Sequence, residues 1–426
     1  MAACVCVSGI LMKGNKMKRR VVVTGMGGIS PIGNNVPEMW NNAKNAMCGI
    51  DYIKSYDTEN QQVKVAGEVK NYNPLDHFDR MQARRIARFT QFAIVAAREA
   101  MKDSGLNMAQ EDPYRCGVNI SSGIGGLPTI EEEHYKGIKR GFDKISPLFI
   151  PMAIANMASG MTAIEFGFKG SCTCVVTACA SGTNAIGEAY RQIKDGYADV
   201  FLTGGAESCI SEFGVGGFTS MKALSTVDDP NRASIPFDKE RSGFVMGEGA
   251  GVLLLEEYEH AKKRGANILA EIVGYGADCD ANHMTAPLED GSGAAECMKM
   301  AMRDADIEPS SIGYINAHGT STAMNDKCET RAVKLAFGDH ANQLKMSSTK
   351  SMTGHLLGAS GGVEAVLTIG ILREQLALPT VNYKEKDPEC DLNIVPNHPE
   401  KIETEYAMSN SLGFGGHNAS LIFRRI

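Results

Sequence analysis

Short apolar runs alternate along this chain with longer segments in which apolar residues recur at helical spacing. The short runs predict strands at 20–24, 117–121, 172–177, 198–203, 252–255, 268–273, 312–316, 406–409 and 419–423. The longer segments predict helices at 84–104, 181–195, 256–264, 294–305, 328–337 and 361–374. Regular alternation of strands with amphipathic or buried helices is typical of an α/β fold.

A short sequence echo indicates an internal duplication. Ala180-Ser181-Gly182 opens one predicted helix and Ala359-Ser360-Gly361 opens another, and each is followed by an apolar helix. Three shared residues are weak support by themselves. We therefore expect two related halves, at 17–265 and 266–426.

Composition restricts the possible functions. Glycine is abundant with 46 residues, which suits many tight strand-to-helix turns, and Trp40 is the only tryptophan. The formal net charge of -7 argues against general nucleic-acid binding. No apolar run is long enough for a membrane helix. These features predict an enzyme that binds neither nucleic acid nor membrane.

The cysteines and the first residues point to the cytoplasm. None of the twelve cysteines is arranged in paired metal-ligand spacing, so most are expected to be small buried side chains in a reducing cytosol. Residues 1–16 place their charges after the apolar stretch, which is the wrong order for a secretory signal. We interpret 1–16 as an extension outside the fold.

Cys179 is the first candidate for chemistry. It ends the apolar run Val175-Val176-Thr177-Ala178 and precedes a small, glycine-containing helix start. A thiol at a helix N-terminus is expected to have its thiolate favoured by the dipole and by free N–H groups, and the thiolate is the nucleophile. Backbone N–H groups at the same turn could form half of an oxyanion hole.

Two histidines follow far downstream, His318 in N-A-H-G-T-S-T and His355 in K-S-M-T-G-H. As neutral imidazoles both could donate N–H bonds to one developing oxyanion, or one could act as a base for the thiol. Zinc-ligand spacing is absent from the sequence. Lys350 is a candidate buried charge, and Glu364, which interrupts an apolar helix, is its candidate partner.

Two glycine-rich segments predict mobile turns beside a pocket. Gly413-Phe414-Gly415-Gly416 lacks nucleotide-loop spacing, so we expect a hinged loop that carries Phe414 over a pocket and adds its N–H to the oxyanion hole. Gly123-Ile124-Gly125-Gly126 places one apolar residue in a flexible turn, which suits a hydrophobic pocket wall.

Four motifs in this order resemble a known family. T-A-C-A-S-G-T at Cys179, N-A-H-G-T-S-T at His318, K-S-M-T-G-H at 350–355 and the closing N-S-L-G-F-G-G-H-N are together similar to the β-ketoacyl-acyl-carrier-protein synthases of the thiolase superfamily. The resemblance is greatest to the elongating synthase II type and covers residues 17–426. It implies a homodimer with a thiolase-like, five-layered α-β-α-β-α fold built from two duplicated halves.

The resemblance also implies a reaction. Cys179 would take an acyl chain from acyl carrier protein, and His318 and His355 would hold the malonyl thioester while carbon dioxide leaves. The chain would grow by two carbons. No cofactor would be required, because the 4'-phosphopantetheine arm arrives on the carrier.

Further roles follow only from the resemblance. The implied catalytic residues are Cys179, His318, His355, Lys350, Glu364 and Phe414. The implied substrate contacts are Ile124, Phe218, Thr285, Thr320 and Thr322, with Phe149 reaching in from the partner subunit. A structural monovalent or divalent cation would be held by Asn316, Glu364, Ser409 and Asn410.

The carrier-binding surface departs from the family pattern. The implied basic residues are Arg84, Arg85, Lys144 and Lys222. Met81 and Asp143 stand where basic residues are common, and Asn282 replaces an aromatic residue. We therefore expect docking of the acidic carrier to be weaker or differently balanced.

Three other functions remain open on sequence alone. A polyketide-type ketosynthase would use the same residues on a different acyl chain. A non-catalytic, carrier-binding partner subunit would typically lack the nucleophile, which is present here. A Cys–His hydrolase would need an activating base and a path for water.

Overall fold

A computed structural model describes residues 19–426, and the predicted extension at 1–16 lies outside these residues. The strands are β1 Val21–Ile29, β2 Asp51–Tyr52, β3 Val65–Ala66, β4 Cys116–Ser121, β5 Cys172–Thr173, β6 Val200–Glu207, β7 Gly249–Glu257, β8 Ala270–Cys279, β9 Ile312–Asn316, β10 Lys345–Ser347, β11 Leu376–Ala377, β12 Glu400–Lys401, β13 Tyr406–Gly413 and β14 His417–Arg424. Within the described range, ten of these strands join in one sheet, in the order β10-β9-β13-β14-β8-β1-β7-β6-β4-β5.

The helices alternate with these strands. They are α1 Val36–Lys44, α2 Arg80–Ala83, α3 Arg88–Ser104, α4 Leu127–Arg140, α5 Phe149–Ala153, α6 Met157–Phe166, α7 Ser181–Lys194, α8 Glu212–Ser220, α9 Tyr258–Lys263, α10 Ser292–Ala305, α11 Ala323–Phe337, α12 Lys350–Thr353 and α13 Ser360–Glu374. No helix in the described part of the chain has the length and apolar character needed to cross a membrane.

The sheet repeats one strand plan twice. In the first half the spatial order is β5-β4-β6-β7-β1, and in the second it is β10-β9-β13-β14-β8, so equivalent strands occupy equivalent places. The pairing directions also match, with parallel pairs at the outer strands and antiparallel pairs beyond β6 and β13. The halves meet through a short antiparallel pairing of β1 with β8. This repeat agrees with the expected duplication.

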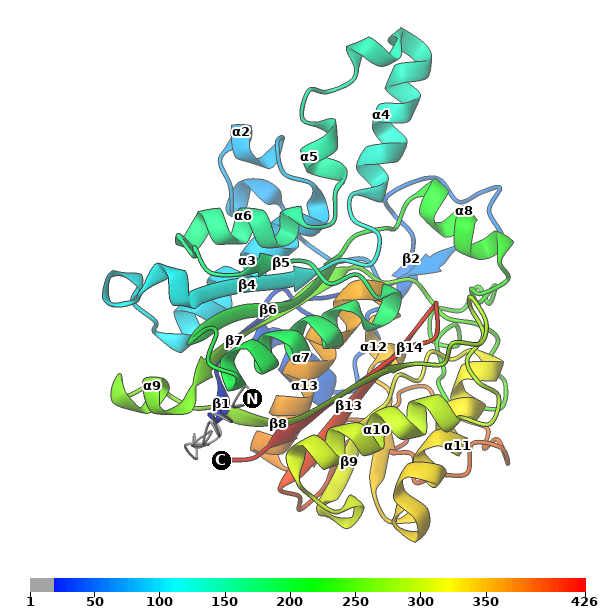
Figure 1. The fold of residues 1–426 in the computed structure, drawn as a ribbon. Helices are drawn as coiled ribbons and strands as arrows, with labels where there is room; N and C mark the ends of the chain where they lie inside the picture. The colour runs from blue at the N-terminus through cyan, green and yellow to red at the C-terminus, as the bar shows by residue number, and fades with distance from the viewer. Residues whose placement is uncertain (1–18) are drawn as a thin grey trace, which may run out of the picture.

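Two helices lie between the halves and form the central layer (Figure 1). Helix α13 packs against β7 and β6 of the first half and β13 of the second, while α7 packs against β6, β4 and α13. Helices α3 and α6 cover the outer face of the first half, and α10 and α11 cover the outer face of the second. The layers therefore run α-β-α-β-α, as expected.

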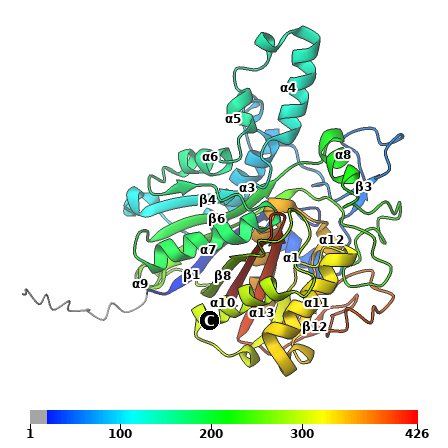
Figure 2. The same cartoon turned by 45° about the vertical axis from the view of Figure 1, so that its right-hand side comes forward.

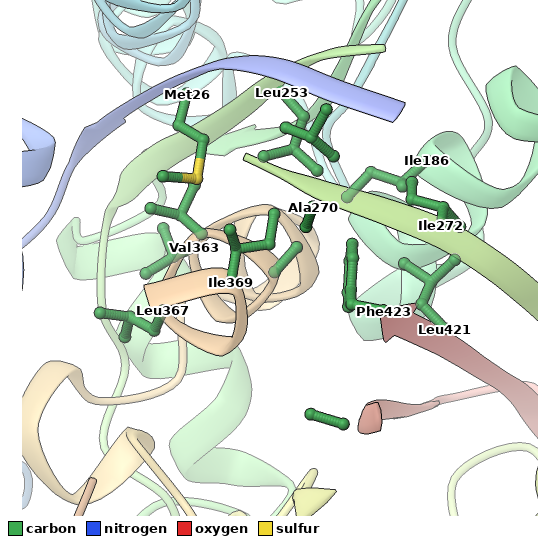
Figure 3. Packing of buried hydrophobic residues seen from close by; sticks show 14 of the residues in the cluster. Met26, Ile186, Leu253, Ala270, Ile272, Val363, Leu367, Ile369, Leu421 and Phe423 are labelled. Atoms are coloured by element: carbon green, nitrogen blue, oxygen red, sulfur yellow. The ribbon is translucent and has the colours of Figure 1, made fainter. Parts of the chain in front are cut away.

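The core surrounds α13, which explains the apolar character of this helix on all sides. Val363, Leu367 and Ile369 pack against Met26 and Leu253 from the first half (Figure 3). On the other side the cluster includes Ile272, Leu421 and Phe423 from the second half. Both halves therefore bury apolar side chains against this one helix.

Both central helices begin at the same unusual backbone turn. A 3-10 turn at Ala178–Ala180 precedes α7, and another at Leu357–Ala359 precedes α13. The first residue of each turn has a positive φ, 50° at Ala178 and 48° at Leu357. A non-glycine residue in this region is strained and is held there by its surroundings. The repeat therefore extends to two equivalent elbows, with Cys179 in the first and Gly358 in the second.

Two predicted elements were partly wrong. The strand predicted at 172–177 is reduced to β5, whose two residues are exposed because β5 is the outermost strand of the sheet. The helix predicted at 84–104 begins at Arg88, because the short helix α2 occupies 80–83 and Arg84 caps it. Helices α4 and α5 project from the body of the molecule as an arm (Figure 2).

Candidate active site

Cys179 lies directly before the N-terminus of α7, and only 8% of its surface is exposed. Ser181 fixes the elbow around it: the Ser181 hydroxyl donates to the Ala178 carbonyl at 2.6 Å and accepts from the Thr177 N–H at 2.9 Å. The strained turn therefore presents the thiol toward a cavity instead of into the core.

The cavity in front of the thiol has a volume of about 360 Å³. It brings together residues from both halves that are far apart in the sequence. Its lining includes the sequence-predicted residues Cys179, Phe218, Lys222, Thr285, His318, Thr320, Thr322, His355 and Phe414. One thiol and two imidazoles thus line one cavity, which is the arrangement that nucleophilic catalysis with oxyanion stabilisation needs.

The two histidines are neutral and nearly perpendicular. Their ring centroids lie 5.3 Å apart at an interplanar angle of 86°. Burial, with the positive charge of Lys350, holds the pKa of both rings well below the usual value. His355 Nδ1 lies 3.0 Å from the Ser360 hydroxyl, and a hydroxyl that donates to Nδ1 leaves the ring proton on Nε2. A neutral imidazole of this kind donates to an oxyanion.

Lys350 lies behind the histidines and forms a buried ion pair with Glu364. This ion pair thus joins α12 to α13. Burial raises the pKa of Glu364, and Lys350 opposes this rise. Because Lys350 also lowers the pKa of both histidines, it helps to keep them uncharged.

The thiol does not have the lowered pKa expected from its place at a helix N-terminus. Burial raises the pKa of Cys179 to about 12, while Lys350 and the backbone N–H of Phe414 act in the opposite direction. Removal of the thiol from water outweighs the nearby positive charge. The resting side chain is therefore a neutral thiol.

The loop that carries Phe414 closes the cavity. Gly415 and Gly416 have φ values of 89° and 78°, which favour glycine. Gly413 packs so closely that a Cβ there would lie 2.6 Å from the Thr177 carbonyl. The Gly416 carbonyl accepts from the Asp280 N–H at 2.8 Å, and the Phe414 ring lies 6.5 Å from that of Phe218. The loop thus has glycines that allow its backbone to turn, and a hydrogen bond holds it against Asp280.

Comparisons with known proteins agree on one family. Residues 18–261 match the family described as beta-ketoacyl synthase, N-terminal domain, and residues 269–384 match its C-terminal domain. The chain is 52% identical over 407 residues to 3-oxoacyl-[acyl-carrier-protein] synthase 2 of Staphylococcus aureus strain COL, covering 96% of this chain and 98% of that relative. It is 48% identical over 412 residues to the synthase 2 of Synechocystis, covering 96% and 99%.

The chain belongs to the β-ketoacyl synthase family. Solved structures agree: a β-ketoacyl synthase from Burkholderia phymatum is 36% identical with a TM-score of 0.88, covering 96% of this chain and 100% of that one. A type II polyketide ketosynthase in complex with its acyl carrier protein matches with the same identity, TM-score and coverage. The expected family and the thiolase-like fold are confirmed.

Sequence reasoning missed one buried acid of this β-ketoacyl synthase. Glu329 on α11 accepts from the N–H groups of His318 and Gly319, both at 2.8 Å, and so fixes the backbone of the histidine turn. Burial raises its pKa to about 7. Its signal was available, because Glu329 shares the buried face of a predicted helix with Ala332 and Val333.

The candidate cation residues are only partly brought together. Asn316 and Ser409 pair across β9 and β13, and Asn316 Nδ2, Ser409 Oγ and Glu364 Oε2 are buried atoms without a hydrogen-bond partner in the described chain. Asn410 points to the opposite face of β13, where its side chain accepts from Ser420 at 2.8 Å. The two oxygen atoms, Ser409 Oγ and Glu364 Oε2, fit a bound water or a hard cation, whereas the Asn316 amide nitrogen is a donor and fits only a water.

The other predicted residues lie away from the cavity lining. Ile124 is 36% exposed in the turn after β4, and Phe149 begins α5 on the arm. Arg84, Arg85 and Lys144 are exposed on the surface, as are Met81, Asp143 and Asn282. Lys222, in contrast, is exposed at the rim of the cavity itself.

Proposed function

We propose that this β-ketoacyl synthase elongates acyl chains by decarboxylative condensation with malonyl-acyl carrier protein, as a 3-oxoacyl-[acyl-carrier-protein] synthase of type II. The observation that carries the proposal is the single cavity in which Cys179 faces two neutral histidines, His318 and His355. The near 50% identity to curated synthases 2 over almost the full chain supports this choice of reaction.

In the loading step, Cys179 Sγ attacks the thioester carbonyl of the acyl carrier. A new carbon–sulfur bond forms, the bond to the carrier's sulfur breaks, and the carrier leaves as a thiol with the proton that Cys179 gives up. The N–H groups of Cys179 and Phe414 would hold the oxyanion during this exchange. Because the resting thiol is neutral, proton loss accompanies the attack.

In the condensation step, the bond between the malonyl α-carbon and its carboxylate breaks and carbon dioxide leaves. The electron pair passes into an enolate whose oxygen accepts hydrogen bonds from His318 and His355. The α-carbon then attacks the acyl-cysteine carbonyl. A carbon–carbon bond forms, the bond to Sγ breaks, and Cys179 takes up a proton again as the 3-oxoacyl carrier leaves.

The carrier is expected to bring both substrates on a phosphopantetheine arm. Thr285, Thr320 and Thr322 line the route into the cavity and offer hydroxyl groups to the amides of such an arm. A related ketosynthase was solved in complex with its acyl carrier protein, which supports this class of partner. Exposed Arg84, Arg85, Lys144 and Lys222 would meet the acidic carrier.

A homodimer would complete the pocket. β5 is an edge strand with both residues exposed, and such an edge is available for pairing with a second copy. Exposed apolar residues also occur on α6, which packs against β5, and on the arm: Ile164 is 73% exposed, and Ile138 and Ile150 are 63% and 59% exposed. A surface this apolar is typical of an interface, and it includes α5, which carries Phe149.

The proposed cation site and the absence of a required cofactor are secondary to the reaction. Glu364 Oε2 and Ser409 Oγ would hold a structural cation, with no part in bond making, and Asn316 would contribute through its amide oxygen. No cofactor is required by the steps above. The free cysteines suit a cytoplasmic protein.

A polyketide-type ketosynthase is the second candidate, because one similar solved structure is a type II polyketide ketosynthase and another is a ketosynthase with a chain length factor. Their identities of 36% and 34% are well below the 52% shared with a synthase 2. A non-catalytic partner subunit is disfavoured by the complete set of Cys179, His318 and His355.

Mass spectrometry of the products tests the proposal. Acyl-carrier thioester and malonyl-carrier protein should give a 3-oxoacyl product two carbons longer, and the Cys179→Ala variant should give none. Free fatty acid alone would instead indicate a hydrolase. A folded protein that accepts only polyketide-type starters would favour the second candidate.

A further inference from the structure

A buried carboxylate outside the reaction steps joins three segments of the site. Glu207 ends β6 and is fully buried. The Gly123 N–H donates to its Oε2 at 2.7 Å and the Gly358 N–H donates to the same atom at 3.0 Å. The Ser122 hydroxyl donates to Oε1 at 2.6 Å. A side chain from the first half thus holds turns from both halves.

Each of these turns is close in sequence to a residue assigned to the reaction. Gly123 precedes Ile124, the residue assigned to the acyl pocket, and the Ile124 N–H itself lies 3.4 Å from Glu207 Oε1. Gly358 lies in the second elbow, three residues after His355. The turns also touch each other, since a Cβ on Gly358 would lie 2.2 Å from the Gly123 nitrogen. The carboxylate is thus the one side chain that binds both turns at their point of contact.

The junction also contacts the nucleophile turn. A Cβ on Gly123 would lie 3.3 Å from the Ala178 carbonyl, directly before Cys179, and 2.9 Å from Glu207 Oε2. Glu207 itself is held by β6, where it pairs with Gly249 of β7. The anchor is therefore rigid, and the glycine turn that it holds lies between Ile124 and the thiol.

The neighbours of the anchor favour an ionised acid and oppose the burial that raises the pKa of Glu207. Every named neighbour of the two oxygen atoms is a donor: the N–H groups of Gly123 and Gly358, the Ser122 hydroxyl, and the Cys209 thiol at 3.4 Å. A carboxylate accepts all of these bonds, whereas an amide would direct its own N–H₂ group at a donor. The conservative glutamine is therefore an informative substitution.

We propose that Glu207 is a positioning residue for acyl loading: its carboxylate holds the Gly123–Ile124 turn where Ile124 bounds the acyl chain, and so sets which chain lengths Cys179 accepts. Glu207 does not touch the reacting atoms. Its negative charge raises the pKa of Cys179, which acts alike on every acyl chain, so any effect on chain length must act through Ile124. This inference rests on the proposed acyl pocket at Ile124.

Single-turnover acylation of Cys179, followed by intact-protein mass spectrometry, tests the proposal with hexanoyl and myristoyl carriers. Glu207→Gln should slow myristoyl transfer by about tenfold more than hexanoyl transfer, because only the long chain must pass the displaced turn. In an Ile124→Ala background the same substitution should cost less than about threefold for either chain. Equal slowing of both chains, or equal cost in both backgrounds, would overturn the proposal.

Two further variants distinguish a local effect on the turn from a general folding defect. Ser122→Ala removes one donor and should reproduce the chain-length effect at about threefold. Glu256→Gln makes the same change at the other end of the β6–β7 pair, far from the turn, and should slow both chains alike if at all. Selectivity with Glu256→Gln as strong as with Glu207→Gln would contradict a local role. Failure of the wild type to acylate Cys179 would instead refute the proposed function.

Discussion

The ammonium group of Lys350 and the carboxylate of Glu364 form an ion pair with side-chain exposures of only 1% and 3%. Both charges lie outside the cavity lining, behind the two histidines. A pair buried this deeply adds little stability over apolar packing, but the loss of one partner leaves a charge without compensation. Its effect on the histidine pKa values explains why the pair stands here.

Lys350→Met should therefore destabilise the protein and impair decarboxylation. We expect the free energy of unfolding to fall by about 3 kcal/mol, because Glu364 loses its partner in the core. The double variant Lys350→Met with Glu364→Leu should regain most of that stability but little activity. Urea unfolding and carbon dioxide release from malonyl carrier measure the two effects. Full activity in the double variant would contradict an electrostatic role.

The alkylation rate of Cys179 should keep rising with pH. Since burial raises the thiol pKa to about 12, the thiolate fraction grows about tenfold per pH unit between about pH 7 and pH 9. Iodoacetamide labelling, read by mass at Cys179 with Cys179→Ala as control, follows this rise. A plateau below about pH 8 would show a thiol that is already ionised at rest.

Gly416→Ala should slow condensation by about tenfold through the Phe414 loop. An alanine would have to adopt a φ of 78°, and its Cβ would lie 2.9 Å from the Asp280 Cβ. Gly265→Ala is a matched control, because Gly265 also has a positive φ, 71°, but has no atom within 4 Å of a Cβ. Steady-state product formation compares the two. Equal loss in both variants would mean that strain alone, not the loop, is responsible.

Charge reversal at Arg84 and Arg85 should raise the KM for acyl carrier protein by about tenfold. Both side chains are exposed, so the change should leave kcat and the reaction with short acyl-pantetheine thioesters unaltered. Arg303→Glu, on α10 and also exposed, serves as the control. An unchanged KM for the carrier would remove these two residues from the docking surface.

His260 should stabilise the fold more at acidic pH. Its ring lies between Glu256 Oε1 at 2.6 Å and Glu111 Oε2 at 2.9 Å, and the bond to Glu256 is the main cause of its raised pKa. The folded protein thus binds the proton more tightly than the unfolded chain. The contribution is complete below about pH 6.5 and is lost as pH rises through the folded value.

Thermal unfolding of the wild type and His260→Gln checks this. The difference in Tm should be larger at about pH 5.5 than at about pH 8.5. A difference that stays constant with pH would indicate packing, not protonation.

The sequence pattern correctly predicted the elements that are apolar and buried on all sides. The strand at 312–316 matches β9, and the helix at 361–374 matches α13 to within one residue, because both are apolar and enclosed. The pattern failed at 172–177, where an apolar run forms an exposed edge. The same composition suits a buried strand or a surface awaiting a partner, and hydropathy does not distinguish these two cases.

For the site, motif residues were predictable and their environment was not. Cys179, His318 and His355 carry recognisable motifs, and the structure places all three around one cavity. The direction of the thiol pKa was wrong, because helix position was visible in the sequence and depth of burial was not. Glu207 and Glu329 bind backbone N–H groups, which no side-chain motif records.

The backbone turn at Ala178 is repeated at Leu357, but only the first copy carries a nucleophile. The second elbow has glycine where the first has its cysteine, and a Cβ there would collide with Gly123 and approach Glu207 at 2.8 Å. A cysteine introduced at position 358 would therefore have no room for its side chain or for a substrate beside it. The turn at 178–180 therefore has space for a reactive side chain, whereas the equivalent turn at 357–359 supports the site by close backbone packing.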